Sequence, residues 1–212
     1  MVAPGIGVEL IEEGTYTVRL DAPFTVTRVG TEHEEDVAAG TDVTLGPGDV
    51  ARFPDYSAPG EIRNAGTDAV SVLGLAILSE ETTGTPVPDL PAEVDARALS
   101  NAYSSDWHKL PPGPVMVTLR RISLPPGAAL APYEPIGLET IHVEQGNISV
   151  GFIPAVETEP SQPPVYGPGS STPLGSAEAG AQRVVSNDRE ESATLLVLTI
   201  APAGNGAATP TS

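Results

Sequence analysis

The sequence predicts an all-β chain built from two similar domains in tandem, and three observations support this prediction. First, 23 Pro and 22 Gly divide the 212 residues into short runs, which is typical of strands separated by turns. Second, these runs alternate or are rich in β-branched residues, whereas helical spacing is nearly absent. Third, the second half of the chain resembles the first, which indicates a duplication.

The internal similarity is carried by two pairs of segments in the same order, 7–18 with 137–150 and 64–77 with 187–200. In the first pair Glu9 matches Glu139 with an offset of 130 (139 minus 9). In the second pair Asn64 matches Asn187 with an offset of 123 (187 minus 64). Because both matches keep their order, we interpret them as two copies of one unit.

Each unit contains five runs that are predicted as strands: 15–20, 24–29, 41–45, 49–53 and 70–78 in the first, and 115–124, 138–144, 147–153, 182–186 and 193–201 in the second. The exception to the β pattern is Pro91 to Leu99, where Asp89 is suited to cap a short helix that begins with proline. The Pro-rich stretch 154–176 is predicted as a long loop that covers one end of the second unit.

These patterns divide the chain into four parts: a first domain over 1–82, a Pro-rich linker with a short helix over 83–113, a second domain over 114–202 and a flexible tail over 203–212. The run 115–124 and its following turn have no counterpart in the first domain, because the offset would place them before Met1. We therefore expect the first domain to lack its opening strand. The open edge is expected to be covered by the linker, the second domain or another subunit, unless the chain has simply been shortened.

Charge and composition exclude several classes of partner. The formal net charge is -18, so nucleic acid and anionic membranes are not expected to bind. The chain has no cysteine and no apolar run long enough to span a membrane, and its first residues do not resemble a signal peptide. Tails such as 203–212 are common on exported modular proteins. We therefore expect a soluble chain, and two localisations stay open: export as part of a longer protein, or no export.

A motif in the second domain suggests a family. Gly127, Tyr133, Pro135, Glu139 and Gly146 have the spacing of the first cupin motif, in which two histidines would stand at Tyr133 and Pro135. Downstream, the chain is similar to the second cupin motif in its latter half, with Gly180, Arg183 at the histidine position, and Asn187. The first Gly and the Pro of that motif are replaced by Thr172 and Glu178.

The first domain resembles the same family less completely. Residues 48–54 fit the start of the second motif, and one extra residue before Asn64 leaves Pro59 or Gly60 at the histidine position. Glu9 is retained, but it is too close to Gly14. The resemblance, which spans all but the linker and the tail, implies two cupin-type jelly-roll β-barrels in tandem, a bicupin, with degenerate metal-binding motifs.

Cupins with an intact motif hold a divalent metal through three histidines and one glutamate, and the metal performs the chemistry. Neither domain keeps a histidine at those positions, so we expect no metal, no cofactor and no metal-dependent catalysis. Of the three histidines, His33 lies in an acidic loop, His108 lies in the linker and His142 alternates out of phase with Glu139, so that it faces away from the barrel interior.

Arg183 is expected to point into the space of the absent metal, near Glu139, and two interpretations remain open. In the first, the two side chains form a buried ion pair that neutralises both charges. In the second, Tyr133, Glu139, Arg183 and Asn187 form a binding site for a small anionic or sugar-like ligand.

We therefore expect a metal-free bicupin that acts as a small-molecule binding or scaffold module. One alternative is a metal-independent enzyme similar to an isomerase or epimerase, with Tyr133 or Glu139 as its base. No catalytic residue is assigned, since Arg183 would lower the proton affinity of Glu139. The other alternative is a purely structural role, with a homodimer formed through barrel edges, and its signature would be a barrel filled by its own side chains.

Overall fold

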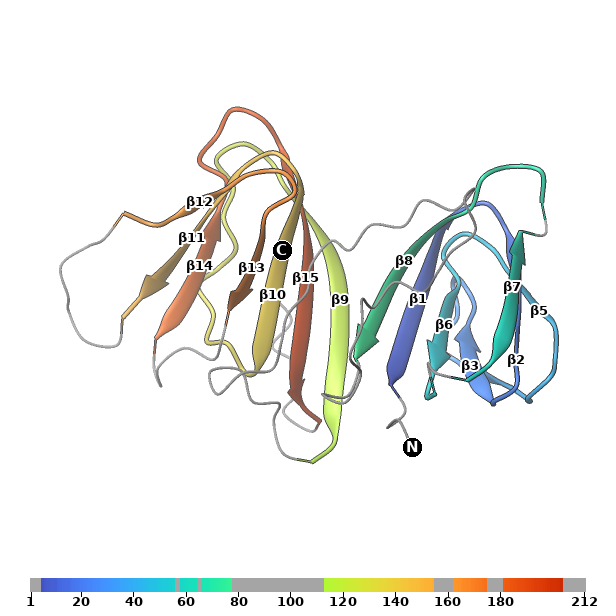
Figure 1. The fold of residues 1–212 in the computed structure, drawn as a ribbon. Helices are drawn as coiled ribbons and strands as arrows, with labels where there is room; N and C mark the ends of the chain where they lie inside the picture. The colour runs from blue at the N-terminus through green and yellow to red at the C-terminus, as the bar shows by residue number, and fades with distance from the viewer. Residues whose placement is uncertain are drawn as a thin grey trace. The chain divides into compact units, whose positions relative to one another are not determined.

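The structure is a computed structural model that describes residues 5–55, 58–64, 66–77, 113–154, 162–174 and 181–203. The chain divides into two compact units, 1–94 and 95–212. Figure 1 shows that the described residues of both units are strands and connecting loops. The expected helix at 91–99, most of the linker and the tail from 204 lie outside the described residues. No helix in the described ranges could cross a membrane.

The first unit forms two antiparallel sheets. Its strands are β1 (Ile6–Glu13), β2 (Tyr16–Leu20), β3 (Phe24–Thr27), β4 (Glu34–Val37), β5 (Val43–Leu45), β6 (Val50–Phe53), β7 (Gly60–Asn64) and β8 (Ser71–Ile77). One sheet has the order β4-β3-β6-β1-β8 and the other has the order β5-β2-β7. Between them lies a core of aliphatic residues with a tilted pair of rings, Phe24 and Phe53, whose centroids are 5.5 Å apart.

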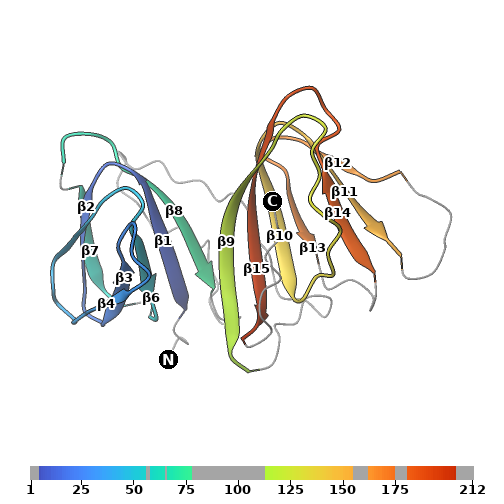
Figure 2. The same ribbon diagram turned by 180° about the vertical axis from the view of Figure 1, so that it is seen from behind.

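The second unit repeats this plan. Its strands are β9 (Val115–Leu124), β10 (Leu138–Gln145), β11 (Ile148–Ile153), β12 (Val165–Tyr166), β13 (Ser171–Leu174), β14 (Gln182–Ser186) and β15 (Ala193–Pro202). The sheets have the orders β13-β10-β15-β9 and β12-β11-β14. Figures 1 and 2 both show β9 at the edge of its sheet, beside β15. The core residues alternate along these strands and include Ile141, Val143, Ile148, Val150 and Leu195.

The duplication is visible strand by strand, because β6-β1-β8 corresponds to β13-β10-β15 and β5-β2-β7 corresponds to β12-β11-β14. The position that β9 holds beside β15 has no strand beside β8 among the described residues. The predicted fold class is therefore confirmed: the part of the chain that the structure describes is all-β and forms two jelly-roll units. Within the described ranges, the first unit lacks the opening strand of the second.

The register corrects one equivalence that the sequence suggested. Ile11 pairs with Val72 just before a bulge, as Val143 pairs with Leu195, so the offset along β1 and β10 is 132 (143 minus 11). Glu139 therefore corresponds to Gly7, and the expected match of Glu9 with Glu139 is wrong. The spacing from Glu9 to Gly14, which was two residues short, results from this shift.

Several segments expected to be loops contain strands. The acidic stretch after His33 forms β4, which lies at a sheet edge where charged side chains stay solvated. The expected loop 154–176 contains β12 and β13, although residues 155–161 and 175–176 lie outside the described residues. The ten predicted strands are present, β9 and β14 with the predicted ends and the other eight with ends shifted by one or two residues, whereas β1, β4, β7, β12 and β13 were not predicted.

Candidate functional site

The candidate site lies inside the second unit, at the end of the unit where β10 and β14 begin and β11 ends. Glu139 is the second residue of β10, and Arg183 is the second residue of β14. Tyr133 lies in the segment before β10, which runs beside β14 so that Tyr133 and Arg183 exchange two backbone hydrogen bonds of 3.1 and 2.7 Å. Backbone pairing therefore holds Tyr133 and Arg183 side by side, and the pairing of β10 with β15 fixes the position of Glu139.

The three side chains meet at one carboxylate oxygen. The Tyr133 hydroxyl donates a hydrogen bond to Oε1 of Glu139 over 2.6 Å, and Nη1 of Arg183 donates to the same oxygen over 2.7 Å. Arg183 is fully buried and Glu139 is 7% exposed. The expected proximity of Arg183 and Glu139 is therefore found in the structure, as a buried ion pair supported by a tyrosine.

The surroundings of Tyr133 determine its protonation state. Burial, the charge of Glu139 and the hydrogen bond to Glu139 raise the pKa of the Tyr133 hydroxyl above its ordinary value. The opposing effect of Arg183 is smaller and does not reverse the shift. Because the hydroxyl keeps its proton at neutral pH, Tyr133 is a hydrogen-bond donor in this site and is poorly suited to act as a base.

Two aromatic rings flank the guanidinium of Arg183. Its central carbon is 5.3 Å from the centroid of the Phe152 ring and 6.0 Å from that of the Tyr133 ring, distances at which cation–π attraction operates. Phe152 pairs with Arg183 across β11 and β14, and it is 51% exposed. Sequence reasoning did not single out Phe152, although alternation with Ile148 and Val150 would have placed it on the inner face of β11.

Asn187, the fourth predicted site residue, is buried but directed elsewhere. Its amide donates hydrogen bonds to the backbone carbonyls of Leu124, Pro125 and Glu191, and its Oδ1 accepts one from the amide of Arg189. These contacts tie the β14–β15 turn to the end of β9. We therefore assign Asn187 to the turn rather than to the group around Arg183.

The residues around Glu139 do not fit a divalent metal. Pro135 has no donor side chain, Tyr133 is protonated, and Arg183 brings a positive charge to the oxygen that a metal would use. The described residues contain no group of three His, Asp or Glu side chains suited to a metal ion. The guanidinium of Arg183 thus occupies the place beside Glu139 that a metal ion would need.

The equivalent positions of the first unit have lost these groups. In the register of β2 with β7, Gly60 corresponds to Arg183 and Leu20 corresponds to Phe152. A different polar pair lies deeper in this barrel, where the Tyr16 hydroxyl donates to Oε2 of Glu9 over 2.5 Å. Burial raises the pKa of Glu9, and the hydrogen bond from Tyr16 lowers it only in part. This pair was not predicted.

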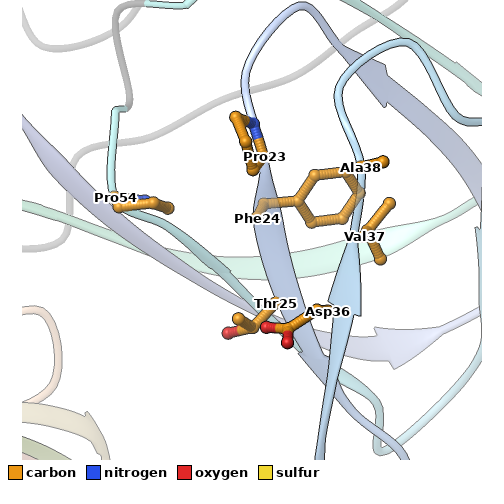
Figure 3. A pocket seen from close by; sticks show the side chains of 7 residues that line it. All are labelled: Pro23, Phe24, Thr25, Asp36, Val37, Ala38 and Pro54. Carbon is orange, nitrogen blue, oxygen red and sulfur yellow. The ribbon is translucent and has the colours of Figure 1, made fainter.

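The first unit also has an apolar pocket of about 440 Å³ between β3, β4 and the end of β6. Figure 3 shows the ring of Phe24 beside Val37 and Ala38, with Thr25 and Asp36 toward the other end. The lining residues are Pro23, Phe24, Thr25, Asp36, Val37, Ala38 and Pro54. This lining has a single ionisable group, Asp36, so it does not suggest a reaction.

His142 lies on the face of β10 away from Glu139, as alternation predicted, since the neighbouring Ile141 and Val143 belong to the core. It is 6% exposed, and its Nδ1 is 2.7 Å from Oγ of Ser171 on β13. His33 precedes β4 and is exposed. His108 lies outside the described residues. Neither described histidine joins the site.

Comparison with known proteins gives structural likeness only. The chain is similar to an oxalate decarboxylase from Lactobacillus farciminis, solved as a formate complex, with 12% identity over 93% of this chain and 71% of that one (TM-score 0.44). It is similar to a cupin 2 conserved barrel domain protein from Leptotrichia buccalis, with 11% identity over 93% and 84% (TM-score 0.32). It is also similar to TT1209 from Thermus thermophilus, with 19% identity over 46% and 91% (TM-score 0.32).

No family model and no curated protein sequence matches the chain. Cupin-fold proteins are thus among the structural neighbours of this chain, and at these identities the likeness concerns the fold alone.

Proposed function

We propose that the chain is a metal-free bicupin with degenerate motifs, and that it acts as a scaffold module rather than as a catalyst. The observation that carries this proposal is the hydrogen-bonded group of Arg183, Glu139 and Tyr133 inside the second barrel. A fully buried guanidinium stands where the motif spacing would put a metal ligand, and it neutralises the glutamate that remains. An exchangeable Lewis acid is thereby replaced by a fixed charge.

The protonation of Tyr133 weighs against the alternative of an isomerase or epimerase. Such an enzyme needs a base that takes a proton near neutral pH. The pKa of Tyr133 is raised, so its hydroxyl stays protonated, and Glu139 is neutralised by Arg183. Tyr133 is therefore poorly suited to act as a base, and the Oε1 atom of Glu139 is already engaged by Arg183 and Tyr133.

A second function, the binding of a small anionic or sugar-like ligand, is favoured by one observation at the barrel end. The Phe152 ring that lies over Arg183 is half exposed, although a phenylalanine of a closed core would be buried. An exposed ring next to a buried ion pair is a surface on which a sugar ring or a small anion can rest. In this case Tyr133, Glu139 and Arg183 would form the floor of the site.

Metal analysis of the purified chain, combined with thermal unfolding in acetate, inorganic phosphate or glucose, tests the two functions. For a scaffold, we expect no stoichiometric metal in the purified chain and no rise in Tm with any of the three probes. A stoichiometric metal that is lost in Glu139→Gln would overturn the metal-free proposal. A rise in Tm that is abolished in Arg183→Met would favour ligand binding over the scaffold.

A further inference from the structure

One side of the first barrel is open where the second barrel is closed. In the second unit, β9 pairs with β15 along its whole length, and the segment after β9 bridges β14 at Ala129 and Tyr133. In the first unit the corresponding strands, β8 and β7, are sheet edges, and the described residues contain no strand beside either of them. In the first barrel, the edges of β7 and β8 therefore border one position. In the second barrel, β9 and the segment that follows it fill the equivalent position.

Two apolar side chains at this position are exposed, although their counterparts in the second barrel are buried. Ile62 on β7 is 60% exposed, whereas its counterpart Val185 is fully buried. Val72 on β8 is 39% exposed, whereas its counterpart Leu195 is fully buried. Val72 pairs with the core residue Ile11, so it lies on the inner face of the sheet. The open side thus exposes apolar surface that belongs to the barrel interior.

Two polar groups also differ from their surroundings in the second unit, because the described residues place no strand beside β8. Asn64 closes its turn as Asn187 does, by donating to the carbonyl of Asp68 and accepting from the amide of Gly66. Asn187 donates in addition to the carbonyls of Leu124 and Pro125 at the end of β9, and for Asn64 the described residues supply no such acceptors. Glu9, on the inner face beside Gly74, accepts a hydrogen bond from Tyr16 but has no ion pair with a described cation.

We propose that this open side of the first barrel, lined by Ile62, Asn64, Val72, Gly74 and Glu9, binds a basic, extended segment of another polypeptide by β-strand addition along β8. Backbone hydrogen bonds to β8, an edge strand among the described residues, would supply affinity, and apolar side chains would cover Ile62 and Val72. The net charge of -18 favours a basic partner and disfavours a second copy of the same chain.

The second barrel indicates which residue type suits the place next to Glu9. There Arg120 of β9 pairs with Val197, the counterpart of Gly74, and Val197 pairs in turn with Ile141, the counterpart of Glu9. A strand docked on β8 in the same register would place an arginine opposite Gly74, about 10 Å from Glu9 between strand axes. Because Gly74 has no side chain, the guanidinium and the carboxylate can meet above it.

The probe is a labelled synthetic peptide with the sequence of residues 115–133, which contains Arg120 and Arg121 and no acidic residue. Fluorescence anisotropy with the whole chain should show saturable binding, and a scrambled peptide should bind at least tenfold more weakly. The variants Ile62→Arg and Val72→Arg should each weaken binding at least tenfold. Ile6→Arg is the matched control, because Ile6 is 49% exposed on the outer face of the same sheet, and it should change binding less than twofold.

A double-mutant cycle between Glu9→Gln in the chain and Arg120→Gln in the peptide tests the charge pairing. Each change alone should weaken binding, and the second should add little once the first is present. Equal weakening by Ile62→Arg and Ile6→Arg, or no binding of the peptide, would overturn the docking site. Self-association in sedimentation that Ile62→Arg abolishes would also overturn it, because the occupant would then be a second copy.

Discussion

At the residue scale, the buried Arg183–Glu139 pair adds little net stability to the fold, but the removal of either partner is costly. A buried ion pair contributes little compared with well-packed apolar residues, because both charges lose their hydration. Once it is present, however, neither charge tolerates the loss of the other. The Tyr133 hydroxyl adds to this dependence because its hydrogen bond is directed at the same carboxylate oxygen.

Replacing Arg183 by Met should therefore lower the free energy of unfolding by about 3–5 kcal/mol, the cost of leaving one buried charge unpaired. Adding Glu139→Leu to this variant should recover much of the loss, since the isolated carboxylate is then removed. Urea denaturation of the single and double variants measures both effects. Arg63→Met, which breaks exposed ion pairs with Asp42 and Glu61, is the control and should cost far less stability than Arg183→Met. A double variant less stable than Arg183→Met would contradict this account.

Asp49 gives a second prediction, with a defined dependence on pH. Burial alone would raise its pKa, but hydrogen bonds from the amides of Gly46 and Val29 and from Arg28 hold the pKa below the ordinary value. A carboxyl with a lowered folded-state pKa stabilises the fold above the unfolded-state value, about pH 4, and loses this contribution as the pH falls through the folded-state value.

Asp49→Asn should cost about 1–3 kcal/mol at pH 7, because the new amide group faces donors where the carboxylate accepted hydrogen bonds. The difference from the wild type should shrink as the pH falls below about 4. Urea unfolding at a series of pH values measures this difference. A difference that does not change between neutral and acidic pH would show that the charge of Asp49 has no role.

At the element scale, most strands with an apolar alternation were predicted, β1 being the exception, whereas strands whose conformation depends on pairing with a neighbour were not. Residues 115–124 and 193–201 carry their own pattern and were predicted almost to their ends. By contrast, β4 consists mainly of acidic residues, and β7 is exposed at every position. The last two, β12 and β13, are short and interrupt a Pro-rich stretch. Pairing with a neighbouring strand, which sequence does not display, decides the conformation of all four.

Two turns of the second unit, one after β9 and one before β11, depend on glycine to different degrees, and this difference can be measured. Gly146, before β11, has a φ of +72°, and a Cβ there would lie 2.5 Å from the carbonyl oxygen of Ser192. Gly127, after β9, has the same φ, but a Cβ there would meet nothing within 4 Å.

Gly127→Ala should therefore cost about 1–2 kcal/mol, the penalty of a left-handed backbone conformation. Gly146→Ala should cost more, because the clash with backbone adds to that penalty. Chemical denaturation of the two variants under one set of conditions provides the comparison. Equal losses would mean that the turn shifts freely and that the close approach to Ser192 has no energetic weight.

At the scale of the whole molecule, duplication was readable in the sequence, but the equivalence of the two copies residue by residue was not. The match of Glu9 with Glu139 suggested an offset of 130, and only the pairing of β1 with β8 and of β10 with β15 showed that the offset is 132. The candidate site was likewise predictable in part. Arg183 and Glu139 were predictable from the motif spacing, whereas the role of Asn187 and the exposure of Phe152 depend on which way side chains and turns face.

The two barrels should consequently differ in whether a metal site can be restored. Replacing Tyr133, Pro135 and Arg183 by His places three imidazoles on the motif spacing around Glu139, a donor set suited to nickel, zinc or manganese. We expect this triple variant to bind one divalent ion per chain by calorimetry and to gain thermal stability on binding, whereas the wild type does neither. Adding Glu139→Gln should weaken binding at least tenfold. In the first barrel Gly7 and Gly60 hold the equivalent positions of Glu139 and Arg183, so a second ion is not expected, and a triple variant that binds none would show that the spacing resembles the cupin motif without its geometry.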